Sequence, residues 1–171
     1  MPYPQHTRSW GPSRAVFVCY DCLRAGRAAF TQDSEFGMVR WEDAIVGLTH
    51  GGPFDPTAFP LTEYETVPGE DGWVRVRLPS EHLLELTRTP AYSSWQGEGW
   101  LIHHTRPMIY LGAWDRAGFE RHAPDGDGRG LFARLQPKQK HLWPSLGSPD
   151  IGVYVFRCAE CGELASYLDF S

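Results

Sequence analysis

Short apolar runs and alternating positions along the chain predict several β-strands. The runs at 15–18 and 153–156 are each followed by a Cys-x-x-Cys pair. At 74–78, apolar residues alternate with arginines, which is the pattern of a half-buried strand. The run at 108–114 lacks this alternation and predicts a strand buried on both faces. Residues 164–170 alternate again, so we expect the second cysteine pair at the tip of a β-hairpin.

Helical periodicity is confined to short segments. Residues 41–48 place their apolar side chains on one helical face, and Ser80 is a suitable N-cap for a helix that begins there. A third stripe lies in 93–104, where selected positions recur three or four apart as on a helix: Gln96, Trp100, and His103 or His104. The pattern as a whole predicts an α+β fold, with a small antiparallel sheet and two or three helices.

Proline- and glycine-rich stretches separate these elements. We expect an irregular N-terminal arm over 1–14 and a long surface excursion over 51–72. The segment 123–130 predicts an exposed turn, and 135–149 predicts a loop interrupted by prolines. With 171 residues, the chain is expected to form a single domain over 1–171.

Composition narrows the classes of function. The net charge is −5, from 16 Lys and Arg against 21 Asp and Glu, which does not favour a nucleic-acid partner. No apolar run approaches the length of a transmembrane helix, so no membrane association is expected. The first 18 residues lack the apolar core of a secretory signal. We therefore expect a protein of the reducing cytoplasm.

Four cysteines carry the clearest chemistry in the sequence. They form two Cys-x-x-Cys pairs at opposite ends of the chain: Cys19, Cys22, Cys158 and Cys161. Four thiolates are a complete ligand set for a structural zinc ion (Zn2+), which would clamp the two termini together through a pair of zinc knuckles. Two less favoured alternatives stay open: a catalytic metal site and redox chemistry of the cysteines.

A second group of residues could form a ligand-binding site. Trp95, Gln96, Trp100 and His103 would line a pocket with aromatic walls and a few polar groups. His103 or His104 could act there as a general base, or could add a metal ligand. Adjacent residues of a helix or strand point to different faces, so we do not expect both histidines in one site. We favour the interpretation that one packs against Trp100 and the other is solvated.

Three sequence blocks resemble the CbrC family of small bacterial proteins. They are CYDCLRAGRAAF at 19–30, RTPAYSSWQGEGWLIHH at 88–104 and YVFRCAECGELASYLDF at 154–170. The resemblance implies a cytoplasmic, zinc-bearing α+β protein, and tolerance toward protein toxins is associated with the family. Two features depart from the family pattern. Residues 1–18 contain no further Cys-x-x-Cys, and Thr105 and Arg106 stand where members tend to have Cys and Asp.

Two functional hypotheses follow from these residues. The first is a non-catalytic zinc protein that binds a protein partner or a small ligand, for example in toxin tolerance or immunity. The second is a small-molecule enzyme that uses His103 or His104 in an aromatic pocket with Trp95, Gln96 and Trp100. We lean toward the first hypothesis, because the four-cysteine set is closed and the signatures of a nucleophile, a phosphate loop and a dinucleotide site are absent.

Overall fold

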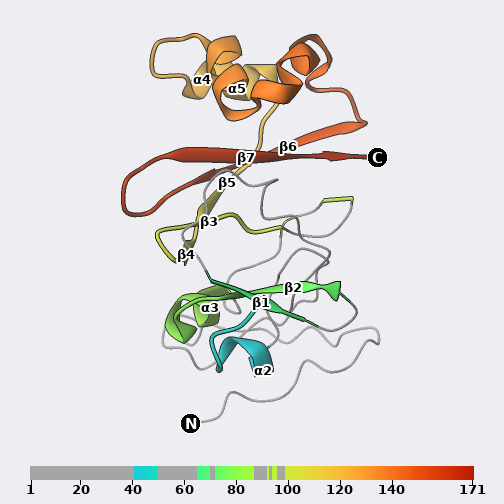
Figure 1. Cartoon of the computed structure of the whole chain (residues 1–171). Helices are drawn as coiled ribbons and strands as arrows, with labels where there is room; N and C mark the ends of the chain where they lie inside the picture. Colours follow the sequence, from blue (N-terminus) through green and yellow to red (C-terminus); the bar gives the residue numbers. More distant parts are fainter. Residues whose placement is uncertain (1–40, 50–64, 70–71, 87–91, 93, 96–98) are drawn as a thin grey trace, which may run out of the picture. The chain divides into compact units, whose positions relative to one another are not determined.

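The computed structural model describes residues 41–49, 65–69, 72–86, 92, 94–95 and 99–171 (Figure 1). The described residues belong to two compact units, one up to Tyr92 and one from Ser94 onward. The predicted arm at 1–14 and most of the predicted excursion at 51–72 lie outside the described residues, as do Cys19 and Cys22. The prediction of a single domain remains a prediction.

The first unit contains a two-stranded antiparallel hairpin and two short helices. Strand β1 (Glu65–Pro68) pairs with β2 (Val74–Arg77), and the helices are α2 (Trp41–Ala44) and α3 (Ser80–Leu86). The predictions of β2 and α3 are confirmed. Strand β1 falls in the predicted surface excursion; cross-strand pairing, which local composition does not encode, makes it a strand.

Helix α2 ends earlier than the periodicity of 41–48 predicts. The backbone of Gly47 has φ +74°, which an α-helix cannot accommodate. A Cβ at this glycine would lie 2.6 Å from the carbonyl oxygen of Leu78, so the close approach of two chain segments requires glycine here. The chain then turns, and Leu48 forms a bridge with Arg77. Tertiary contact therefore ends the helix.

The second unit is built on a three-stranded antiparallel sheet in the order β5-β6-β7. Strands β6 (Ile151–Arg157) and β7 (Leu164–Phe170) form the predicted hairpin, which is confirmed. Strand β5 (Ile109–Ala113) confirms the predicted strand, but not its burial. Ile109 and Leu111 are exposed, because β5 is an edge strand of this sheet and a register shift lies between Tyr110 and Gly112.

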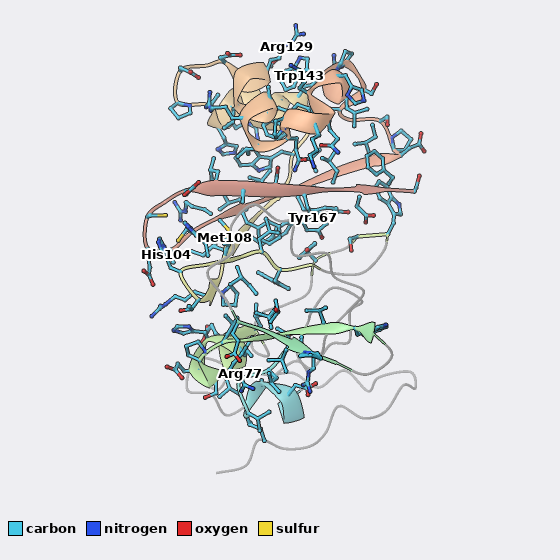
Figure 2. The ribbon with its side chains drawn as sticks, in the orientation of Figure 1. Arg77, His104, Met108, Arg129, Trp143 and Tyr167 are labelled. Carbon is cyan, nitrogen blue, oxygen red and sulfur yellow. The ribbon has the colours of Figure 1, made fainter. Side chains whose placement is uncertain are left out.

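One face of this sheet is covered by helices α4 (Arg116–His122) and α5 (Gly128–Leu135), as Figure 1 shows. A 3₁₀ helix, η3 (Pro137–Ser145), follows α5. The shared core includes Phe119, Phe132, Val153 and Val155, with Trp143 packed against it (Figure 2). Removing such apolar surface from water is the main stabilising contribution to this unit.

The predicted turn at 123–130 and loop at 135–149 are therefore partly wrong. Helix α5 begins inside the first segment, because the Asp127 side chain accepts a hydrogen bond from the Gly130 N–H at 2.8 Å and caps it. Asp115 caps α4 in the same way through the Gly118 N–H. An Asp-Gly step is a turn signal and a helix-start signal at once.

The opposite face of the sheet carries packed aromatic rings. Tyr110 and Phe156 lie 5.3 Å apart, and Tyr167 stacks on Tyr154 at 5.1 Å. Trp100 contacts this face edge-on, at 5.8 Å from Phe156. The central strand β6 is therefore buried on both faces, which explains its uninterrupted apolar run.

The helix-like stripe predicted over 93–104 is wrong where the chain is described. Strand β3 (Ile102–His103) pairs with β4 (Arg106–Pro107) in a short hairpin. The Met108 N–H donates to the Leu101 carbonyl at 2.8 Å and extends this hairpin toward β5. Both Leu101 and Met108 are buried, so tertiary burial overrides the weak 3.6-residue pattern.

The fold class is α+β, with small antiparallel sheets as predicted. The described residues contain four α-helices rather than two or three. None of the helices in the described ranges is long and apolar enough to cross a bilayer.

Candidate metal centre

The cysteine pair lies in the turn between β6 and β7. The Cys158 N–H donates to the Glu163 carbonyl at 2.8 Å, and the Gly162 N–H donates to the Cys158 carbonyl at 3.1 Å. Gly162 has φ +77°, which closes the turn without a Cβ penalty. Cys158 is buried and Cys161 is exposed. The turn therefore holds two thiols near the tip of the hairpin, one facing inward and one reachable from solvent.

The histidine pair lies in the second hairpin tip, between β3 and β4. His103 ends β3, and His104 and Thr105 form the two-residue turn with φ 51° and 55°. Two successive positive φ angles define a type I′ turn, the tight turn that matches strand twist. The two imidazole rings stack at 4.0 Å between centroids. Our expectation that both histidines cannot serve one site is wrong, because the left-handed turn brings the second ring alongside the first.

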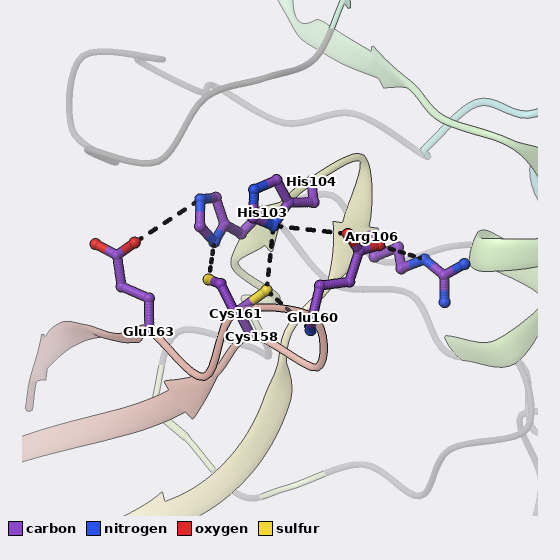
Figure 3. A network of polar contacts seen from close by, with 7 residues as sticks. All are labelled: His103, His104, Arg106, Cys158, Glu160, Cys161 and Glu163. Carbon is purple, nitrogen blue, oxygen red and sulfur yellow. Dashed lines mark hydrogen bonds and ion pairs between the residues drawn. The ribbon is translucent and has the colours of Figure 1, made fainter.

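The two hairpin tips meet and place two thiols against two imidazoles (Figure 3). Cys158 Sγ lies 3.5 Å from His104 Nδ1, and Cys161 Sγ lies 3.6 Å from His103 Nδ1. One ligand atom from each residue lies within 4.8 Å of the other three. This His103, His104, Cys158 and Cys161 group could hold a metal ion. Two sulfur and two nitrogen donors suit a transition metal of intermediate softness.

The two thiols have opposite pKa shifts. Burial raises the pKa of Cys158, but hydrogen bonds from the backbone of Cys161, the His104 ring and the backbone of Glu160 outweigh burial and lower it to about 6. For Cys161, a hydrogen bond from the Glu163 backbone lowers the pKa, while slight desolvation, the neighbouring Cys158 and the charge of Glu163 together raise it above the usual value. Ionisation of one thiol thus disfavours ionisation of the other, and a bound cation would allow both to ionise.

Two carboxylates and one guanidinium surround this group. Glu163 Oε2 lies 3.9 Å from His103 Nε2, and Glu160 Oε2 lies 3.9 Å from His104 Nδ1. The other Glu160 oxygen lies 3.1 Å from Arg106 Nε (Figure 3). The four candidate ligands therefore have charged neighbours that can stabilise a cation or orient an imidazole.

The remaining predicted site residues have other neighbours or lie outside the described residues. Gln96 lies outside them, as do Cys19 and Cys22. The Trp95 side chain is exposed, and the backbone N–H of Trp95 donates to the buried Asp169 carboxylate at 2.8 Å. Trp100 packs on Phe156, whereas His103 faces Cys161. Trp100 thus packs on the three-stranded sheet, whereas His103 belongs to the group of candidate metal ligands.

The sequence predicts two further cysteines as the partners of Cys158 and Cys161, and one histidine at most as an added metal ligand. The sequence indicates only part of this site. The histidine pair and the cysteine pair each lie between two extended segments, as residues at a hairpin tip do. The His104-Thr105 turn contains neither Gly nor Asn, so the usual sequence mark of a type I′ hairpin is missing. Pairing between the two tips is a tertiary contact that periodicity does not report.

Comparisons with known proteins identify the family of the chain. Neither a curated protein nor a solved structure matches the chain. One family model matches residues 11–170, a range that includes both cysteine pairs and both histidines. On the strength of this match over nearly its whole length, the chain belongs to the family described as Uncharacterised protein family (UPF0167).

Proposed function

We propose that the protein binds a structural zinc ion through His103, His104, Cys158 and Cys161. The observation that carries this proposal is the spacing of the ligand atoms. Zinc bonds of about 2.3 Å to sulfur and about 2.0–2.1 Å to nitrogen give a tetrahedron with S···N edges of about 3.6 Å. The Cys158–His104 and Cys161–His103 S···N distances are 3.5 and 3.6 Å, and all four ligand atoms lie within 4.8 Å of one another. Two edges of the group thus match those of a tetrahedral zinc site.

The donor set favours a mononuclear zinc site over other metal centres. Calcium and magnesium prefer oxygen ligands, which this group lacks. A two-iron cluster with two cysteines and two histidines places the pairs on different irons. Sulfur and nitrogen atoms bound to different irons would lie farther apart than 3.5 Å. Zinc uses two thiolates and two imidazoles in many structural sites.

A structural role suits the ligand count. Four protein ligands fill a tetrahedral zinc ion, whereas catalytic zinc keeps one position for water or substrate. The ion would join the β3–β4 tip to the β6–β7 tip, which are far apart in sequence. Because metal binding to a folded site is also folding free energy, its main effect would be on stability.

The four-cysteine set predicted from sequence competes with this arrangement for the same two thiols. Cys158 and Cys161 belong to both sets, so the partners decide between them: His103 and His104, or Cys19 and Cys22. A clamp of the termini requires the second pair. Substitution of each partner pair separates the two arrangements.

The test is zinc content and zinc affinity of purified, untagged protein and three variants. We expect a single tightly bound zinc ion per chain in the wild type, loss of that ion in Cys158→Ser and in His103→Ala, and its retention in Cys19→Ser. Loss in Cys19→Ser with retention in His103→Ala would instead assign the four-cysteine clamp. A wild-type protein that binds no zinc would overturn the proposal in both forms.

The biological role we propose is non-catalytic recognition of a partner in the cytoplasm, with toxin tolerance or immunity as its concrete form. Two of the three blocks that resemble the CbrC family, 88–104 and 154–170, contain all four proposed ligands. The net charge of −5 suits a basic partner such as a nuclease toxin. The enzyme alternative has less support, because His103 and His104 each face a thiol rather than Trp95 or Trp100.

This role is tested by challenging bacteria that express the protein with purified protein toxins. We expect survival to rise with the wild type and not with Cys158→Ser, together with a complex between the protein and the toxin. Absence of both protection and complex would overturn the role and leave zinc binding intact. Turnover of a small molecule that His103→Ala abolishes, with zinc still bound, would favour the enzyme.

A further inference from the structure

We propose that Glu163 is a positioning residue for His103, accepting a hydrogen bond from its Nε2–H while Nδ1 binds the metal. This inference rests on the proposed zinc function. The two nitrogens of the His103 ring face two different groups. Nδ1 lies 3.6 Å from Cys161 Sγ, and Nε2 lies 3.9 Å from Glu163 Oε2 (Figure 3).

The chemistry of a ligand histidine requires such an acceptor. A neutral imidazole carries one proton, so binding of a cation at Nδ1 leaves the proton on Nε2. The His103 side chain is only 11% exposed, so water has limited access to the ring. An acceptor beside Nε2 then selects the tautomer, holds the ring plane and makes Nδ1 a stronger donor to the metal.

Glu163 can provide that acceptor without changing the fold. Its side chain is 55% exposed and can rotate toward Nε2, closing the 3.9 Å gap to hydrogen-bond distance. Its backbone carbonyl already accepts from the Cys158 N–H at 2.8 Å. The backbone bond maintains the cysteine turn whatever the side chain is, so substitution of Glu163 tests the carboxylate alone.

Glu160 provides a matched control in the same turn. Its carboxylate also lies 3.9 Å from a histidine nitrogen and is similarly exposed, at 49%. That nitrogen is His104 Nδ1, the same atom that faces Cys158 Sγ. Glu160 therefore lies on the ligand side of its imidazole, and its second oxygen is engaged by Arg106. It adds negative charge near the site but cannot accept from the far side of the ring.

The experiment compares zinc affinity in Glu163→Ala, Glu163→Gln and Glu160→Ala by competition with a chromophoric chelator. We expect Glu163→Ala to weaken zinc binding about 10- to 100-fold, the usual effect of losing an outer partner of a ligand histidine. Glu163→Gln should lose less, because its amide oxygen still accepts. Glu160→Ala should change the affinity less than about fivefold, as for an exposed ion pair.

A spectroscopic measurement separates positioning from general electrostatics. In zinc-loaded, nitrogen-15-labelled protein, we expect a slowly exchanging Nε2–H signal for His103 in the wild type and in Glu163→Gln, and fast exchange in Glu163→Ala. Unchanged affinity and exchange in Glu163→Ala would overturn the inference while zinc binding stands. Equal weakening by Glu163→Ala and Glu160→Ala would also overturn it, in favour of bulk negative charge. A wild type that binds no zinc would end both this inference and the proposed function.

Discussion

The two cysteines of the β6–β7 turn show how position within one motif divides the chemistry of identical side chains. Cys158 is buried and receives several hydrogen bonds, whereas Cys161 is exposed and the charge of Cys158 raises its pKa. A thiolate at Cys158 makes a second thiolate at Cys161 unfavourable unless a cation lies between them. The motif is therefore suited to a metal ion more than to two independent thiols.

Residue-scale electrostatics also predicts a pH dependence on the aromatic face of the sheet. Burial, and then the charge of Asp169, raise the pKa of Tyr154; burial, and then Tyr154, raise that of Tyr110. A raised pKa in the folded state means that stability is fully present below pH 10 and is lost as pH rises further, because the unfolded chain ionises first. We expect the free energy of unfolding to fall above about pH 10.

Urea denaturation at a series of alkaline pH values measures this effect, with absorbance of the tyrosinate ion as the direct probe. Tyr154→Phe is the control, and it should have a smaller loss of stability over the same range. An identical pH dependence in the wild type and in Tyr154→Phe would contradict the assignment to this side chain.

At the scale of elements, the tight turn between β3 and β4 is strained. His104 and Thr105 both adopt positive φ, and Thr105 is β-branched. Left-handed backbone costs roughly 1–2 kcal/mol for a residue with a Cβ. Such strain persists where surrounding contacts fix the backbone, and here His104 contacts Cys158 and His103.

Replacing Thr105 with Gly should therefore stabilise the zinc-loaded protein by up to about 1 kcal/mol, after the entropy that Gly adds to the unfolded chain is subtracted. Chemical denaturation at saturating zinc measures the change. The matched control is Ala113→Gly, on an exposed position of β5 without positive φ, which should destabilise by about 0.5–1 kcal/mol. Equal destabilisation by both variants would contradict strain at Thr105.

The contact between α4 and α5 depends on a glycine because the two helix backbones approach each other closely. A Cβ on Gly128 would lie 2.5 Å from the Glu120 nitrogen and 2.8 Å from the Phe119 carbonyl carbon, both backbone atoms. Backbone cannot move aside as a side-chain tip can, so Gly128→Ala should destabilise by about 1–3 kcal/mol. Thermal unfolding measures it, with the exposed neighbour Arg129→Ala as control. A neutral Gly128→Ala would show that the helices can separate at little cost.

At the scale of the whole molecule, zinc removal should lower stability, because the proposed ion would join two hairpins that are distant in sequence. A ligand that binds only the folded state adds about 2.7 kcal/mol when its free concentration is a hundred times its Kd. We expect the Tm to rise with added zinc and to fall in chelator. In Cys158→Ser the Tm should no longer respond to zinc. Equal Tm values with zinc and with chelator in the wild type would contradict a structural ion.

The features that were predicted correctly from sequence are those that depend on residues close together in the chain. Strands β2, β6 and β7, helix α3 and the turn that holds Cys158 and Cys161 were all predictable, because alternation, N-caps and the Cys-x-x-Cys spacing are local. Helices α4 and α5 were missed. Their start signals, Asp115 and Asp127, stand in segments whose glycines favour a turn equally well.

The α+β class, the cysteine turn and the family of the chain follow from the order of residues alone. The exposed edge position of β5, and the meeting of His103 and His104 with Cys158 and Cys161, are visible only in the folded chain. The physical reason is that alternation and turn chemistry depend on neighbours in the chain. Edge position and the meeting of two hairpin tips depend on packing between segments about 50 residues apart, and the order of residues alone does not report that packing.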